Sequence, residues 1–253
     1  MTAPALIPAG GPLAAATAGG HLELVSEFEV KPGGHVNPHR HPTHEFYLVR
    51  AGRGLMTVGQ ASWEIAPGDL VTIPSQVVHS LEPVGEEPIR CFCFAVADRG
   101  APRVDYGSDG EAGGSAVPAP GDGPPAAVPR TALPALDVRS PRALEPALEH
   151  RGTVAVWWTV APRELRPATL GGRLGEVRAH ALTAGGAPLT VAPAHALRLY
   201  AVEAGEGTIE VDGERRPLRA DDVAFVGPGR AHALGGELSL VSVVYELNEE
   251  EAA

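Results

Sequence analysis

Residues 33–52 read GGHVNPHRHPTHEFYLVRAG. His39 and His41 stand two residues apart and Glu45 follows four residues later, so all three side chains leave the same face of an extended chain. Imidazole and carboxylate groups bind metals when they converge. The stretch therefore predicts a β-strand region that carries part of a metal site.

A fourth candidate ligand, His79, lies outside this stretch. It follows the turn Ala66-Pro67-Gly68-Asp69 on a separate apolar strand, and closure of the sheet would bring it opposite the other three. Three neutral imidazoles and one carboxylate accept Fe, Mn, Ni, Cu, Co or Zn. We expect one divalent transition metal, with Fe as the first expectation, and two neighbouring positions left for water, O2 or a chelating substrate.

The rest of the chain predicts two all-β domains. Short apolar runs typical of β-strands flank a segment rich in Pro, Gly, Ala and Ser that cannot form a core of its own. We expect a first domain at 1–98, a linker at 99–134 and a second domain at 135–253. A helix is expected only at Pro141–His150.

The two halves are related by an internal repeat at a constant spacing of 153 residues, without gaps. Such a repeat predicts duplicated domains with the same strand order. The matched positions include Ala51-Gly52-Arg53-Gly54 with Ala204-Gly205-Glu206-Gly207, Tyr47 with Tyr200, Asp69 with Asp222 and His79 with His232.

The sequence resembles the cupin superfamily. The family's first motif, G-x5-H-x-H-x3-E-x6-G, is met at every fixed position by Gly33, His39, His41, Glu45 and Gly52. The second motif, G-x5-P-x-G-x2-H-x3-N, is met by Gly68, Pro74 and His79, whereas Gln76 replaces its glycine and Pro83 its asparagine. The resemblance implies two antiparallel jelly-roll β-barrels in tandem.

The same resemblance assigns the metal to the first barrel. The family's ligands carry over to His39, His41, Glu45 and His79. In the second barrel only one imidazole remains and a cation replaces the carboxylate, so no divalent metal is expected there. The equivalent residues there are Ala192, Ala194, Arg198 and His232. That barrel is either a filled, structural one or an anion or carboxylate pocket built from Arg198 and His232.

Two residues near the predicted ligands are candidates for proton transfer. Tyr47 shares the inward parity of Glu45, and His35 shares the parity of His39. The pocket walls are expected to be apolar, formed by Val49, Met56, Phe92 and Phe94. The two cysteines, Cys91 and Cys93, are expected to be buried packing residues.

An apolar pocket around open metal positions favours O2 chemistry, because it keeps water away from reactive species. The leading hypothesis is therefore an O2-using dioxygenase acting on a small organic molecule in bacterial metabolism. A metal-dependent isomerase, lyase or cyclase that uses the metal as a Lewis acid is the alternative. A non-catalytic small-molecule-binding protein is the third hypothesis.

Charge and composition limit the partners. The chain of 253 residues has 20 basic and 31 acidic residues, a formal net charge of -11, and no basic cluster interleaved with aromatics. Such a balance disfavours nucleic acid as a partner. The lack of a long apolar run and of a signal-peptide pattern predicts a cytoplasmic protein without a membrane segment, either a monomer or a homodimer.

Overall fold

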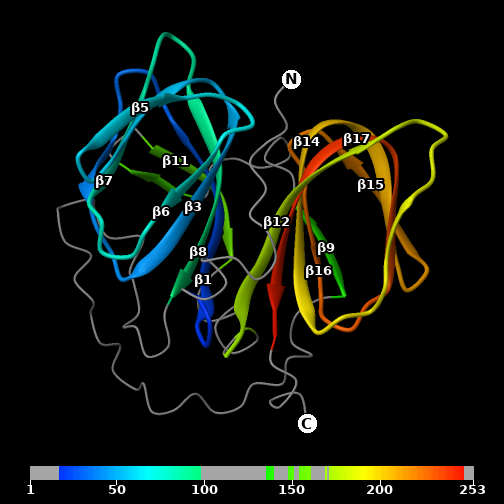
Figure 1. Ribbon diagram of the computed structural model, residues 1–253. Coiled ribbons are helices and arrows are strands. Elements are labelled where there is room, and N and C mark those ends of the chain that lie inside the picture. The colour runs from blue at the N-terminus through cyan, green and yellow to red at the C-terminus, as the bar shows by residue number, and fades with distance from the viewer. Residues whose placement is uncertain are drawn as a thin grey trace. The chain divides into compact units, whose positions relative to one another are not determined.

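The computed structural model describes residues 17–97, 135–139, 148–150, 154–160, 169 and 171–247 (Figure 1). All elements among these residues are β-strands, which confirms the predicted all-β class. No helix in this part of the chain is long and apolar enough to cross a membrane. The predicted linker at 99–134 lies outside the described residues.

The first of two compact units comprises residues 20–127 and 144–166. We call it the first barrel. A six-stranded sheet has the order β10-β11-β1-β8-β3-β6, and a four-stranded sheet has the order β2-β7-β4-β5. The strands are β1 (His21–Val30), β2 (Val36–His39), β3 (Thr43–Ala51), β4 (Gly54–Val58), β5 (Ala61–Ile65), β6 (Leu70–Ile73), β7 (His79–Pro83), β8 (Ile89–Ala97), β10 (Leu148–His150) and β11 (Val154–Val160).

The second unit, called the second barrel, comprises residues 1–19, 128–143 and 167–253. Its sheet has the order β12-β17-β14-β16-β9, while β13 pairs with β17 and β15 pairs with β14. The strands are β9 (Leu136–Arg139), β12 (Arg173–Leu182), β13 (Leu189–Val191), β14 (Ala196–Val211), β15 (Glu214–Arg219), β16 (Val223–Val226) and β17 (His232–Glu246).

The strands confirm the internal repeat. Residues 43–58, which form β3 and β4 in the first barrel, correspond at the spacing of 153 to the single long strand β14. Strand β6 corresponds residue for residue to β16, and β7 begins at His79 where β17 begins at His232. The duplication therefore preserves strand order as well as sequence.

Close backbone approach explains one glycine of the motif. Gly52 has a φ of 71°, and a Cβ there would lie 2.0 Å from the carbonyl oxygen of Pro88. Its equivalent, Gly205, has a φ of 91° and would place a Cβ 1.9 Å from the carbonyl oxygen of Glu237. Only glycine fits such a position without moving the neighbouring strand.

The boundary between the two units does not run where the sequence places it. Strands β10 and β11 belong by sequence to the predicted second domain at 135–253, yet β11 pairs with β1, from Val25↔Val160 to Val30↔Val154. The helix predicted at Pro141–His150 is wrong at its C-terminal end, because residues 148–150 form β10; residues 141–147 lie outside the described part. Pairing of β10 with β11, from Leu148↔Val156 to His150↔Val154, outweighed the local helical pattern.

The core of the first barrel lies between its two sheets. Met56 from β4 and Leu81 from β7 are fully buried and pack in one cluster with Tyr47 and Val49 from β3. Cys91 and Cys93 belong to the same cluster, which confirms that they are buried packing residues. The candidate metal ligands face this cluster of buried side chains.

The expected wall positions of Phe92 and Phe94 are wrong. Tyr47 pairs across β3 and β8 with Cys93, whereas Phe46 pairs with Phe94 and the two rings stack at 4.6 Å. Because directly paired residues share a face, Phe94 lies on the face opposite to Tyr47, and strand alternation places Phe92 there too. The parity of β8 relative to β3 is set by sheet register, which the sequence did not reveal.

Candidate metal centre

The four predicted ligands come from both sheets of the first barrel. His39 ends β2 and pairs directly with His79 at the start of β7, and Glu45 lies on β3. His41 stands in the short connection between β2 and β3. The chain thus crosses from one sheet to the other within the histidine motif, which brings ligands of both sheets to one corner.

The four side chains form a compact, largely buried cluster. One ligand atom from each lies within 4.8 Å of the others. His41, Glu45 and His79 are 3%, 3% and 1% exposed, and His39 is half-buried. The structure therefore brings together all four residues that the motif assigns to the metal.

Hydrogen bonds fix the direction of the imidazole rings. Nδ1 of His39 donates to the carbonyl oxygen of Asn37 at 2.8 Å, and Nδ1 of His79 donates to that of Val77 at 3.0 Å. Nδ1 of His41 lies 2.7 Å from the hydroxyl of Thr43. With Nδ1 engaged, each ring presents Nε2 to the centre, as metal-binding histidines usually do.

Glu45 is the electrostatic focus of the cluster. Its Oε2 lies 3.1 Å from Nε2 of His41 and 3.3 Å from Nε2 of His79. Burial by itself raises the pKa of this carboxyl, but the two imidazoles hold its pKa well below the usual value. The carboxylate is thus charged and ready to act as a ligand.

The imidazoles differ in their electrostatics. Burial and the neighbouring His79 lower the pKa of His39. Burial also disfavours the charged form of His41, but the charge and hydrogen bond of Glu45 raise its pKa. Without a metal ion, a proton on His41 balances the negative charge of Glu45. A bound metal cation would balance that charge in its place.

Tyr47 contacts the ligand set directly. Its hydroxyl donates to Oε2 of Glu45 at 2.9 Å. Burial and the charge of Glu45 raise the pKa of Tyr47 well above the usual value, so the phenol keeps its proton. Of the two candidates for proton transfer, Tyr47 lies at the site, whereas His35 is exposed before β2 and is not among the four clustered residues.

Cys93 is a site residue that the sequence reasoning assigned to packing alone. Its thiol lies 3.8 Å from Oε1 of Glu45, the oxygen that Tyr47 does not contact. Burial and the carboxylate raise the pKa of this thiol well above the usual value. The spacing of Cys91 and Cys93 gave their shared face, but only the register of β8 against β3 shows that Cys93 points at Glu45.

The donor set fits a divalent transition metal. Nε2 of His79 is buried and lies 3.3 Å from Oε2 of Glu45 without the geometry of a hydrogen bond, so a metal ion between the two atoms would satisfy both. Three imidazoles and one carboxylate suit Fe, Mn, Co, Ni, Cu or Zn. His39, His41, Glu45 and His79 would hold the ion.

The equivalent corner of the second barrel holds no such cluster. Among the described residues, the first barrel has the one group of histidine, cysteine and acidic side chains close enough to hold a metal. In the second barrel the hydroxyl of Tyr200 lies 2.6 Å from Nε2 of His232, the atom that would otherwise face a metal.

Comparison with known proteins identifies the first barrel. Residues 26–95 match the family model described as a cupin domain. A 1-methylthio-D-xylulose 5-phosphate methylsulfurylase from Rhodospirillum rubrum is 37% identical over 82 residues, which are 32% of this chain and 53% of that protein. A dimethylsulfoniopropionate lyase from Ruegeria pomeroyi is 33% identical over 78 residues, 31% of this chain and 50% of that protein. The chain spans about half the length of these curated relatives.

A solved structure matches most of the chain. Salicylate 1,2-dioxygenase from Pseudaminobacter salicylatoxidans superposes with a TM-score of 0.51 at 15% identity, over 87% of this chain and 71% of that chain. At this identity the likeness shows the fold alone. The family match thus identifies residues 26–95 as a cupin domain whose His/His/Glu/His cluster fits the metal motif of that family, while the likeness over the rest of the chain is one of fold.

Proposed function

We propose that the first barrel is the active site of a metal-dependent enzyme that acts on a small organic molecule by proton transfer, in a lyase- or isomerase-type reaction. The observation that carries this proposal is the hydrogen bond from Tyr47 to Glu45, 2.9 Å long, in a buried four-ligand cluster. It holds a proton beside the ligand set, where proton-transfer chemistry needs one. The metal would supply Lewis-acid or redox chemistry.

The roles of the protein groups follow from their positions. His39, His41, Glu45 and His79 would hold the ion, and Tyr47 would hydrogen-bond to a substrate oxygen or pass it a proton. The apolar residues around Tyr47, among them Met56 and Leu81, would exclude water from the substrate. Two curated relatives of this barrel are named as a lyase and a methylsulfurylase, which supports this class of reaction.

An O2-using dioxygenase is the second candidate, because the buried cluster around Tyr47 consists of apolar side chains and the two thiols. Such walls protect oxidising species from water. The structural similarity to a salicylate 1,2-dioxygenase adds only the fold to this argument. The two candidates differ in one measurable requirement, which is the consumption of O2.

The test uses the full chain loaded separately with Fe(II), Mn(II) and Zn(II). Dimethylsulfoniopropionate is the first probe for lyase activity and salicylate the first for dioxygenase activity, since relatives are named for them. We expect turnover of a lyase or isomerase substrate without O2 and with a redox-inactive ion. Turnover that stops under anaerobic conditions would instead support the dioxygenase.

Two variants define the roles of the site. His39→Ala with His41→Ala should lose the metal and all turnover. Tyr47→Phe should keep the metal, measured by elemental analysis, and lose about 10²–10⁴-fold in kcat. Full activity of metal-loaded Tyr47→Phe would remove proton transfer by this residue from the proposal.

A further inference from the structure

The corner of the second barrel keeps the backbone of the metal centre. The amide of Gly229 donates to the carbonyl oxygen of Ala194 at 2.8 Å, as the amide of Gln76 donates to that of His41 at 2.9 Å. Nδ1 of His232 bonds to the carbonyl oxygen of Arg230 at 3.1 Å, again as in the first barrel. The frame of a binding site is therefore present with different side chains on it.

Two of the side chains at this corner are shorter than their equivalents in the first barrel. Ala192 and Ala194 stand where the first barrel has the imidazoles of His39 and His41, and both alanines are exposed. Each change removes a ring from the corner, and exposure shows that solvent reaches it. A small molecule can therefore reach, from solvent, the place that the two rings occupy in the first barrel.

A cation replaces the carboxylate. Arg198 stands at the position of Glu45, is half-buried, and hydrogen-bonds to the hydroxyl oxygen of Tyr200. No carboxylate among the described residues lies within ion-pair distance of its guanidinium group. A half-buried arginine without an acidic partner is well suited to bind an anionic ligand through its planar donors.

The neighbouring groups support a positive corner. The strand register β12-β17-β14 places Arg178, Ser242 and Tyr200 in one row on the face that carries Arg198. On the same face, Nε2 of His180 lies 2.9 Å from the hydroxyl of Ser242. The nearby carboxylate, Glu176, already pairs with Arg178 at 2.9 Å, so it does not neutralise Arg198.

Burial, and with it the charge of Arg198, lowers the pKa of His232. The ring is therefore neutral and accepts the hydrogen bond from Tyr200, which is 2.6 Å long. Burial raises the pKa of Tyr200 to about 12, so its hydroxyl keeps the proton. Tyr200 is thereby fixed beside Arg198 as a second polar group at the corner.

We propose that this corner is a metal-independent binding site for a small organic carboxylate, held by the guanidinium of Arg198 with the hydroxyl of Tyr200 beside it. The guanidinium donates to the carboxylate oxygens, while the apolar part of the ligand lies over Ala192 and Ala194. Tyr200, whose proton goes to His232, positions the guanidinium by accepting its hydrogen bond. The duplicated barrel is then a second ligand site and not a filler, and its site is independent of the reaction in the first barrel.

The test is a calorimetric titration of the full chain with benzoate, after removal of metals with EDTA. Metal removal matters because an ion in the first barrel would itself attract carboxylates. We expect saturable binding of about one benzoate per chain and none of benzamide, its neutral analogue. Arg198→Gln should weaken binding at least about tenfold, and Tyr200→Phe severalfold.

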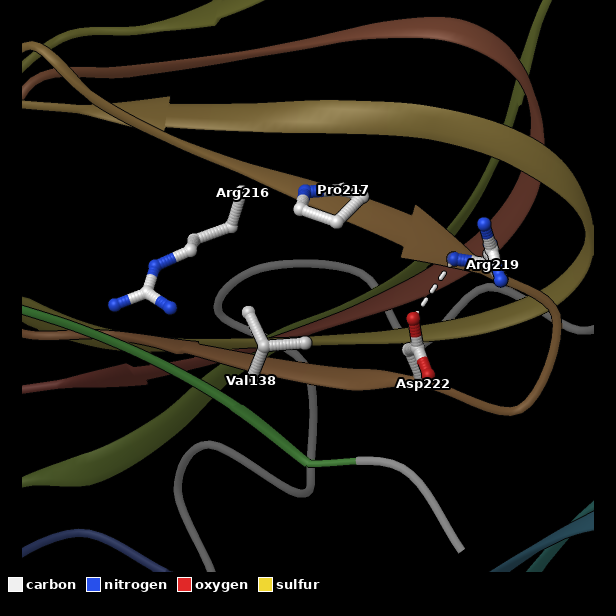
Figure 2. A pocket seen from close by; sticks show the side chains of 5 residues that line it. All are labelled: Val138, Arg216, Pro217, Arg219 and Asp222. Atoms are coloured by element: carbon white, nitrogen blue, oxygen red, sulfur yellow. Dashed lines mark hydrogen bonds between the residues drawn. The ribbon is translucent and has the colours of Figure 1, made fainter. Parts of the chain in front are cut away.

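A matched control comes from an open pocket of about 380 Å³ on the same barrel, shown in Figure 2. Its Arg216 is an exposed cation paired with Glu214, so Arg216→Gln should leave benzoate binding unchanged. Circular dichroism verifies that each variant is folded. If Arg198→Gln does not fold, the unfolding temperature of the parent tests the same site. Benzoate should raise this temperature, benzamide should not, and the rise should be the same in Arg216→Gln.

The proposal would be overturned by no benzoate binding to the folded parent, by equal binding of benzamide, or by unchanged binding to a folded Arg198→Gln protein. Binding that appears only with metal present would place the ligand in the first barrel and would also overturn it.

Discussion

Glu45 in the first barrel and Arg198 in the second occupy the same place on the same strand, with opposite charge. Around Glu45 stand three imidazoles, and around Arg198 stand two alanines and one imidazole. The backbone bonds that orient His79 and His232 are nevertheless the same in kind. The same backbone arrangement thus occurs at the equivalent corners of both barrels, and the four side chains on it determine what each corner can bind.

The two barrels also differ in the residues that contact the ligand positions. Thr43, which hydrogen-bonds to His41 at 2.7 Å, corresponds to Ala196 in the second barrel, where no imidazole remains to be held. The hydroxyl of Tyr47 donates a hydrogen bond to Glu45, whereas that of its equivalent, Tyr200, donates one to His232. Supporting groups thus changed together with the ligands they support.

The largest effect is expected from equivalent histidine replacements. His79→Ala removes a ligand and should reduce bound metal from about one equivalent per chain to near zero. His232→Ala, at the same place in the second barrel, should leave the metal content unchanged. Elemental analysis of both proteins after dialysis measures this, and metal lost equally from both would contradict the assignment of a single site.

Equal core substitutions test whether the two barrels are equally packed. Leu81 and Leu234 are equivalent and both fully buried. Leu81→Ala and Leu234→Ala should each lower the free energy of unfolding by about 2–5 kcal/mol, while exposed Leu55→Ala should cost far less.

Urea titrations separate the two barrels, because Trp63, Trp157 and Trp158 all belong to the first unit. Tryptophan fluorescence then reports the first barrel, and circular dichroism reports both. A loss below about 1 kcal/mol at one leucine would show that its barrel is loosely packed.

A smaller effect is expected at the support of His41. Thr43→Ala gives the first barrel the residue that the second barrel already has. Because the ring of His41 would lose its orienting hydroxyl, metal affinity should fall about 10–100-fold with the fold unchanged. Competition with a fluorescent chelator measures the affinity. Thr43→Ser, which keeps the hydroxyl, serves as the control and should bind metal nearly as the parent does.

The smallest effect concerns a backbone conformation. Gln76 has a φ of 64° where the second barrel has Gly229 at 74°. An L-residue with a side chain pays about 1–2 kcal/mol in this left-handed region. Gln76→Gly should therefore stabilise the first barrel by about 0.5–1 kcal/mol after the greater flexibility of glycine in the unfolded chain is counted.

The reverse exchange, Gly229→Gln, should destabilise the second barrel by about 1 kcal/mol. A destabilised Gln76→Gly protein in thermal unfolding would mean that the side chain of Gln76 contributes more than its backbone strain removes.

The all-β class, the duplication and the four-residue cluster could be predicted from the sequence. These depend on features that spacing alone fixes. The spacing of the histidine motif predicted the ligand set, and a gap-free repeat carries the strand order from one half to the other. The single strand face expected for His39 and His41 is wrong, because β2 ends at His39 and His41 lies in the connection to β3.

The pairing of the strands could not be predicted from the sequence. The assignment of β10 and β11 to the first barrel, the inward turn of Cys93 in place of Phe94, and the exposure of His35 all depend on register between strands distant in sequence. The alternation of a strand gives two faces but does not say which one is inside. The partner of Tyr47 and the lack of an acidic partner for Arg198 among the described residues likewise follow from packing, because they are set by side chains on other strands.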